Sequence, residues 1–520
     1  MSNPLLNLND LPPFGTIKPA HMVEAIETII NESRKAINNL TENLTPETIT
    51  WDNFVKPLED INDRLDRAWG PISHLNSVAN SDDIREAYNA CLPLLSDYGT
   101  EMGQHKGLFN AVKALNGRAD ALDLDKVQRK ILNDDLRDFK LSGVALSEDK
   151  QQRYGEIQKR LSELTSTFEQ HLLDATMAWH KDFDSVDALD GLPESAKAAA
   201  KQTAEAADVD GYRITLDFPS YLPVMMHANN RELREEVYTA FATRASETGP
   251  NAGKFDNSDI MPEILALRHE LALLLDFEHY GELSLATKMA KSTDEVMGFL
   301  NELADKSKPQ AEKDLQELTD FARETHAVAK LEAWDFAYYS EKLKNERYKI
   351  SQEELRPWFP ENQVIKGMFE ITGTLFNIKF QERDDIETWH KDVRFFDIYD
   401  LNDHYIASFY LDLYARRNKR GGAWMADCIG RRRSEQGIQK PVAFLTCNFN
   451  GPVGETPALF THDEVTTLFH EFGHGLHHML TEIDYASVAG ISGVPWDAVE
   501  LPSQFLENFC WEEQGLAKIA

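Results

Sequence analysis

The chain has 520 residues, and its 87 Asp and Glu against 54 Lys and Arg give a formal net charge of −33 at pH 7. Such a charge repels nucleic acid and anionic lipid, so we expect neither as a partner. The four cysteines form no C-x-x-C pair and no stretch reaches the ~20 apolar residues of a membrane span, which argues against a disulfide framework, a cysteine-based zinc site and a membrane protein.

The first part of the chain shows helical patterns and no targeting signal. Residues 1–10 have no basic region followed by an apolar core and no Arg-rich amphipathic pattern, so we expect a cytoplasmic protein. Beyond them, apolar residues recur at helical spacing through most of the first 340 residues. We predict a mainly α protein with a helical N-terminal region over residues 1–345 and a second region over residues 346–520. The clearest helical segments are 24–40, 82–95, 148–173, 230–246, 260–275 and 293–325.

Strand patterns come late in the chain. The turn sequence at 400–403 predicts that two of the strands form a hairpin. We therefore expect a small sheet. Packing in a core is a sufficient explanation for most of its side chains. An exposed edge strand of this sheet can pair with an extended peptide backbone, a mode that tolerates many peptide sequences. The segments rich in β-branched and aromatic residues are 376–380, 393–399, 405–413 and 442–449.

The densest positive charge lies at residues 416–420, which read Arg-Arg-Asn-Lys-Arg, with three more arginines at 431–433. A solvated loop is the simpler interpretation. Because Gly421 and Gly422 follow directly, this run is also a candidate for binding the C-terminal carboxylate or the acidic side chains of a peptide. Gly421 and Gly422 are therefore candidate substrate-contacting residues.

Residues 470–474 read His-Glu-Phe-Gly-His, an H-E-x-x-H motif in a segment with helical apolar spacing. Histidines four apart on an α-helix lie on one face, so the imidazoles of His470 and His474 can converge on one tetrahedral Zn²⁺. Glu471 lies beside the first histidine, where its carboxylate can take a proton from a water held by the metal. This motif is typical of zinc hydrolases that cleave peptide bonds.

The motif needs a helix long enough to present both histidines. Thr461 is a candidate N-cap with Glu464 as its capping-box partner, and we predict a helix over about 462–480. Gly473 and Gly475 lie inside it, where glycine costs ~1 kcal/mol relative to alanine. Close approach of another backbone, or of substrate, would explain these glycines.

The third ligand is expected to be a carboxylate downstream. His477 is unsuitable, because a straight helix carries it about 10 Å along the axis from the first motif histidine, and we assign it a packing or hydrogen-bonding role. The segment 496–507 offers Asp497, Glu500 and Glu507, which share one face if the segment is helical. We choose Glu500 because it is central to that face and leaves Asp497 one turn earlier to orient a histidine. For Asp497 and Glu507, a solvated acidic face is an equally good interpretation.

These motifs resemble the thimet-oligopeptidase family of zinc metallopeptidases. The resemblance rests on the H-E-x-x-H motif with the Gly-Leu-His-His that follows it, and on the Glu-Leu-Pro-Ser-Gln run at 500–504. It extends over the chain from the first residues to the last. The other matching segments are 73–78, 151–157, 249–255, 409–414, 419–423 and 446–449.

The resemblance implies a cytosolic endopeptidase that acts on short, unstructured peptides. It implies a helical ellipsoid of two regions split by a deep substrate channel, with one Zn²⁺ per chain at its floor. The small sheet would lie next to the zinc-binding helices, as in a zincin-like catalytic domain. The zinc ligands would be His470, His474 and Glu500, with Glu471 as the catalytic base. The family continues beyond the position of Ala520, so we expect a catalytic region truncated at its C-terminus.

Two alternative functions stay open at this point. A peptidyl-dipeptidase of the same family would release C-terminal dipeptides, and a truncated chain could bind zinc and peptides without turnover. We expect a monomer. The two-histidine, one-glutamate ligand set can also accept Co²⁺ or Mn²⁺.

Overall fold

The structure, a computed structural model, describes residues 3–6 and 10–520, so residues 1–2 and 7–9 of the N-terminal segment considered for a targeting signal lie outside it. The described residues form eighteen α-helices and three small sheets, which confirms the prediction of a mainly α fold. Across the same residues, no helix has the length and apolar character that crossing a membrane requires. All four cysteines are buried free thiols.

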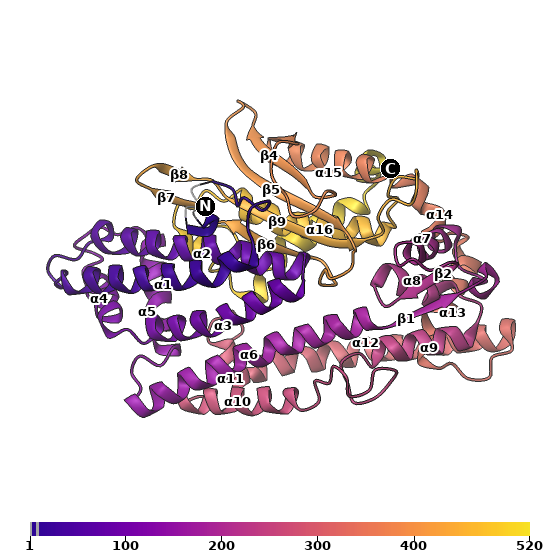
Figure 1. The fold of residues 1–520 in the computed structure, drawn as a ribbon, viewed down its shortest axis with the longest axis horizontal. Helices are drawn as coiled ribbons and strands as arrows, with labels where there is room; N and C mark the ends of the chain where they lie inside the picture. Colours follow the sequence, from indigo (N-terminus) through magenta and orange to yellow (C-terminus); the bar gives the residue numbers. More distant parts are fainter. Residues whose placement is uncertain (1–2, 7–9) are drawn as a thin grey trace.

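Five helices form a bundle at the N-terminal end of the molecule (Figure 1). The helices predicted at 24–40 and 82–95 are present here as the first and the third. Their apolar stripes face one another and make one large core with part of the main sheet. The bundle consists of α1 (Pro19–Glu42), α2 (Lys56–Val78), α3 (Asp82–Gly103), α4 (Lys106–Gly117) and α5 (Lys126–Leu141).

A second group of helices runs along the side of the molecule opposite the main sheet (Figure 1). It contains the helices predicted at 148–173, 260–275 and 293–325. Long side chains of the first and second of these helices form bidentate ion pairs, such as Arg153 with Glu270 at 2.7 and 2.8 Å. The group consists of α6 (Glu148–Ala178), α10 (Ile260–Leu274), α11 (Tyr280–Leu285) and α12 (Thr293–His326).

The end of the molecule opposite the N-terminal bundle holds a smaller core around a two-stranded antiparallel sheet (Figure 1). The helix predicted at 230–246 is present but ends earlier, at Ala242. Its Arg234 is buried and pairs with the buried Asp335 at 2.9 Å, which ties this helix to the segment before α13. The elements are β1 (His180–Phe183), α7 (Glu194–Glu205), β2 (Tyr212–Thr215), α8 (Phe218–His227), α9 (Arg231–Ala242) and α13 (Phe336–Tyr348).

The main sheet has five strands, β3 (Ile378–Arg383), β4 (Arg394–Asp400), β5 (Tyr405–Tyr414), β9 (Val442–Phe449) and β6 (Trp424–Ile429), in that spatial order. The predicted hairpin is confirmed, because β4 and β5 pair antiparallel around the turn at 400–403. β5 and β9 pair parallel, and the other neighbours pair antiparallel. β6 forms one edge and was not predicted from the apolar pattern. A separate small hairpin consists of β7 (Arg432–Ser434) and β8 (Gly437–Gln439).

The two faces of the main sheet pack against different helices. Tyr410 and Phe444 point from one face into the core of the N-terminal bundle, and Phe409 and Leu445 point from the other face into a second core. This alternation follows from the period of two along a strand. The predicted boundary between residues 345 and 346 and the predicted deep channel stay predictions. The helices on the second face are α14 (Gln352–Leu355), α15 (Glu361–Phe376), α16 (His462–Met479), α17 (Leu501–Glu507) and α18 (Glu513–Ile519).

His74 of α2 marks the contact between the N-terminal bundle and the sheet. Its ring stacks on Phe444 at a centroid distance of 3.7 Å and meets the edge of Trp389 at 4.2 Å. Burial lowers the pKa of His74 to about 3, because the charged imidazolium would lose its hydration among these rings. The histidine therefore acts as a neutral aromatic residue of the core.

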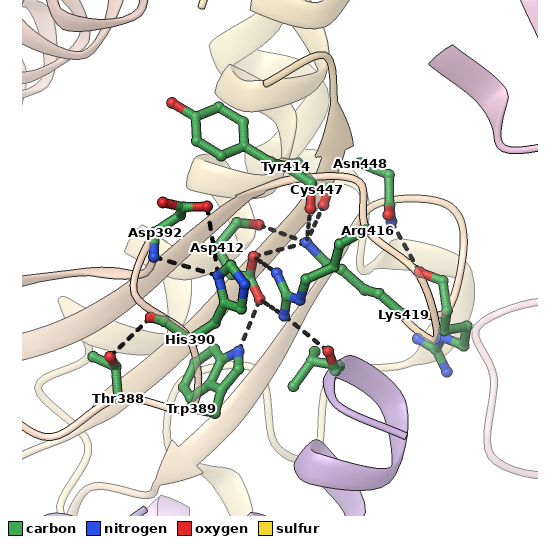
Figure 2. Close-up of polar contacts among 12 residues, drawn as sticks. Thr388, Trp389, His390, Asp392, Asp412, Tyr414, Arg416, Lys419, Cys447 and Asn448 are labelled. Atoms are coloured by element: carbon green, nitrogen blue, oxygen red, sulfur yellow. Dashed lines mark hydrogen bonds and ion pairs between the residues drawn. The ribbon is translucent and has the colours of Figure 1, made fainter. Parts of the chain in front are cut away.

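Two residues of the basic run at 416–420, Arg416 and Lys419, are not solvated, so the solvated-loop interpretation is wrong for them, while Arg417 and Arg420 are exposed. Figure 2 shows Lys419 and Arg416 converging on the buried carboxylate of Asp412. The Lys419 ammonium donates to Asp412 Oδ1 at 2.8 Å and to the Cys447 carbonyl at 2.6 Å, and Arg416 donates to both carboxylate oxygens at 2.6 Å. Arg416 also donates to the carbonyl of Val78 at 2.8 Å. This cluster fixes the loop before β6 between the sheet and the end of α2.

The neutral state of His74 makes a testable prediction about stability. Between pH 6.5 and pH 3 the unfolded chain binds a proton at His74 that the folded protein does not bind, so the free energy of unfolding falls as the pH falls. For one such histidine, the loss between pH 7 and pH 5 is about 2 kcal/mol. We expect His74→Phe to reduce the pH 7 to pH 5 difference by this amount, measured by urea unfolding at both values. An unchanged difference would contradict the neutral assignment.

Candidate metal centre

Helix α16 presents the H-E-x-x-H motif and begins where the capping residues predict. The Thr461 side chain accepts a hydrogen bond from the Glu464 backbone at 3.1 Å, and the Glu464 carboxylate accepts one from the Thr461 backbone at 2.8 Å. These reciprocal bonds form the predicted capping box, which is confirmed. The apolar stripe of the helix is buried in the core behind the sheet. The motif histidines therefore stand on a rigid element.

Gly473 allows α17 to cross α16 at very short range. A Cβ atom at Gly473 would lie 2.6 Å from both the Pro502 carbonyl oxygen and the Ser503 Cα. A Cβ at Gly475 would lie 2.9 Å from the Leu445 side chain. The expectation that a closely approaching backbone explains a glycine in this helix is therefore confirmed at Gly473. The crossing brings the start of α17 to the two histidines.

The three predicted ligands lie together. The Oε2 atom of Glu500 lies 3.2 Å from Nε2 of His470 and 3.0 Å from Nε2 of His474. Donor atoms of the three residues all lie within 4.8 Å of one another. Four donors at 2.0–2.1 Å around a tetrahedral Zn²⁺ would be about 3.3 Å apart. The two separations between histidine and glutamate and the types of the three donors therefore suit one zinc ion.

Glu500 does not lie inside a continuous helix, the condition under which the three acidic residues would share one face. The segment 496–507 is not one helix, because a 3-10 turn at Trp496–Ala498 is followed by α17, which begins at Leu501 with Glu500 as its N-cap. Pro502 explains the break, since proline is tolerated in the first turn of a helix but not further along it. The carboxylate of Glu500 is half exposed and points from the start of α17 towards α16.

Two further side chains hold predicted ligands in place by hydrogen bonds. Nδ1 of His470 lies 2.7 Å from Oε1 of Glu507 and donates to it, which turns Nε2 towards the other donors. The buried hydroxyl of Ser503 donates to Oε2 of Glu500 at 2.7 Å. Glu507 was one of the candidates named from the sequence. Ser503 was missed, although its place three residues after Glu500 in a turn was a usable signal.

Asp497 does not orient a histidine, so that expectation is corrected. Its carboxylate accepts hydrogen bonds from the backbone N–H groups of Met289 and Ala290 instead, at 2.9 to 3.0 Å. The physical reason is the break before Glu500, which removes Asp497 from the face of α17 that meets α16.

The remaining candidates do not join the three donors. His477 lines an apolar cavity of about 730 Å³ next to Gly473 and Phe505, and its buried Nδ1 has no hydrogen-bond partner within residues 3–6 and 10–520. Gly421 and Gly422 lead into β6, and the carbonyl of Gly422 accepts a hydrogen bond of 2.6 Å from the Asn448 side chain.

Glu471 lies buried between the motif histidines and the edge of the sheet. Burial raises the pKa of Glu471 to about 7, and the nearby Glu500 carboxylate adds to the rise, while His470 and the backbone N–H of Met425 oppose it. The Met425 contact places the edge strand β6 beside this carboxylate. Burial also lowers the pKa of His474, which favours the neutral imidazole that binds metals.

Comparisons with known proteins agree with this geometry. Residues 224–520 match the model of peptidase family M3, and residues 26–151 match the neurolysin and thimet oligopeptidase N-terminal domain. The chain is 60% identical over 521 residues to Oligopeptidase A of Haemophilus influenzae, covering 100% of this chain and 76% of that protein. It is 29% identical over 524 residues to Dipeptidyl carboxypeptidase of Escherichia coli, again covering 100% and 76%. The solved structure of PZ peptidase A with an inhibitor shares the fold, with a TM-score of 0.51, 15% identity, and coverage of 94% of this chain and 68% of that one.

The chain belongs to peptidase family M3. It is an enzyme of the metallopeptidase class, and its similarity over the whole length to Oligopeptidase A places it among the oligopeptidases.

The crossing at Gly473 makes a prediction about stability. In Gly473→Ala the new methyl group meets backbone atoms that have no room to move, so we expect a loss of about 1–3 kcal/mol in the free energy of unfolding. At Gly298, inside α12, an added methyl group would have no neighbouring atom within 4 Å, so Gly298→Ala should instead stabilise by about 0.5–1 kcal/mol. Urea unfolding of both variants tests this contrast, and equal effects would contradict it.

Proposed function

We propose that this enzyme is a zinc-dependent endopeptidase that hydrolyses short, unstructured peptides. In this proposal His470, His474 and Glu500 hold one Zn²⁺ and Glu471 is the general base. The observation that supports it most is the convergence of the two imidazoles and one carboxylate at separations that suit a tetrahedral ion. Membership of the M3 family adds independent support.

The chemistry divides between the metal and the side chains around it. Bound zinc would polarise the scissile carbonyl and lower the pKa of water. Glu471 would accept a proton from the attacking water and pass it to the nitrogen of the leaving amine, so that the C–N bond breaks without a free amide anion. Glu507 keeps the His470 ring turned to the site, and Ser503 holds the Glu500 carboxylate.

The edge strand β6 suggests how a substrate is held. It has no strand neighbour on its outer side within the described residues, and it packs against α16, the helix that carries Glu471. An extended peptide that pairs with this edge would lie across the general base with its backbone in register. Because such pairing reads the backbone, we expect broad sequence specificity.

The peptidyl-dipeptidase alternative has weaker support. The chain is 60% identical to the relative named Oligopeptidase A and 29% identical to the one named Dipeptidyl carboxypeptidase over similar lengths. This difference favours an oligopeptidase over a dipeptidyl carboxypeptidase. A cytoplasmic location, a monomeric state and the use of zinc over Co²⁺ or Mn²⁺ stay parts of the proposal.

Product analysis of a ~10-residue unstructured peptide by mass spectrometry tests the proposal directly. With zinc added, we expect internal cleavage that falls by about 10²–10⁴-fold in Glu471→Gln, because the general base is lost, while one equivalent of zinc remains bound. The exposed Glu435→Gln has the same charge change and should retain activity.

Three outcomes would count against the proposal. Release of C-terminal dipeptides alone would favour the peptidyl-dipeptidase. Zinc binding without any cleavage by the unmodified chain would favour a binding module. Full activity of Glu471→Gln would remove Glu471 from the mechanism.

A further inference from the structure

A contact between distant parts of the chain lies just before the predicted third ligand. Both carboxylate oxygens of Asp497 lie 3.0 Å from the backbone nitrogen of Met289, and Oδ2 lies 2.9 Å from that of Ala290. The partners are more than 200 residues apart in sequence, with separations of 208 and 207. Met289 and Ala290 belong to the connection between α11 and α12.

The contact lies on the N-terminal side of Glu500, where it can hold the backbone that carries this residue. After Glu500, Pro502 and Ser503 fix α17 against α16 at the glycine crossing. Before Glu500, Val499 is buried, but the side chain of Trp496 is 73% exposed and packs little. The carboxylate of Asp497 is therefore the polar anchor on that side, and the Glu500 carboxylate lies between the two fixed points.

The chemistry of the contact suits an anchor. An ionised carboxylate that accepts from two successive backbone N–H groups makes charge-assisted hydrogen bonds, which are stronger than bonds between neutral groups. An asparagine at this position would keep one neutral acceptor oxygen, and an alanine would keep none. The contact can thus be weakened in steps without disturbing any buried side chain, because Asp497 is exposed.

We propose that Asp497 is a positioning residue for the metal centre. By binding the α11–α12 connection, it holds the segment before α17 so that the Glu500 carboxylate meets both imidazoles. We call the contact of Asp497 with Met289 and Ala290 the clasp. Its effect passes to Glu500 through the backbone of the two intervening residues, Ala498 and Val499, and does not involve contact with the metal or the substrate. This inference rests on the proposed zinc site. It adds that the α11–α12 connection, which belongs to the predicted N-terminal region, supports that site.

A graded set of variants tests the clasp with two readouts that do not depend on turnover. Zinc affinity is measured by competition with a chelator in the full chain, and hydrogen exchange is measured at the amides of residues 289 and 290. We expect Asp497→Ala to weaken zinc binding by about tenfold, as loss of a supporting contact typically does, and Asp497→Asn to weaken it less. Exchange at 289 and 290 should rise in the same order. The exposed Glu513→Ala removes the same charge from the same end of the chain and should change neither readout.

The outcomes separate this inference from the zinc proposal. If the unmodified chain binds no zinc, the zinc proposal fails first. If it binds zinc and the Asp497 variants bind it within twofold while exchange rises, the clasp exists but positions nothing, and the inference is wrong. Unchanged exchange at 289 and 290 would also overturn it, because the clasp would then not protect these amides.

Discussion

The whole centre depends on the absence of one side chain. Gly473 has no Cβ, so the backbone of Pro502 and Ser503 can lie against α16 at a distance that no other residue would allow. That crossing sets where α17 begins, and therefore where the carboxylate of Glu500 stands relative to the two imidazoles. Glycine in a helix interior is ~1 kcal/mol less favourable than alanine, but at this position it allows the three donors to converge.

The sheet joins this centre to the N-terminal bundle. One face packs on the bundle through residues such as Phe444, and the other packs on α16 through Leu445, so the position of α16 is set through the sheet. The loop before β6 is held by the buried pairing of Lys419 with Asp412, whose charges are satisfied by each other and by backbone carbonyls. The same loop leads into the strand whose Met425 meets Glu471.

The features predicted correctly from the sequence are those that depend on residues close to one another in the chain. The capping box at Thr461, the helix that follows it, the β4–β5 hairpin and the long helices each follow from a local pattern. The features that were missed depend on how separate elements pack together. Lys419 looked like a solvated cation although Asp412 is only seven residues earlier, because the sequence pattern does not show that this loop turns back onto β5. Asp497 looked like a partner for a histidine because its true partners lie 207 and 208 residues earlier. The shared acidic face considered for 496–507 required a continuous helix, and the segment breaks for a local reason, since Pro502 limits where α17 can begin.

X-ray absorption spectroscopy at the zinc edge tests the central claim, that these three side chains form one metal site. For the zinc-loaded chain, we expect a first shell of two imidazole nitrogens at ~2.0–2.1 Å with the remaining ligands oxygen at ~2.0–2.2 Å. His474→Ala should lose the signal of one imidazole or the metal altogether. A sulfur ligand at ~2.3 Å, or a third imidazole in the shell, would contradict the claim.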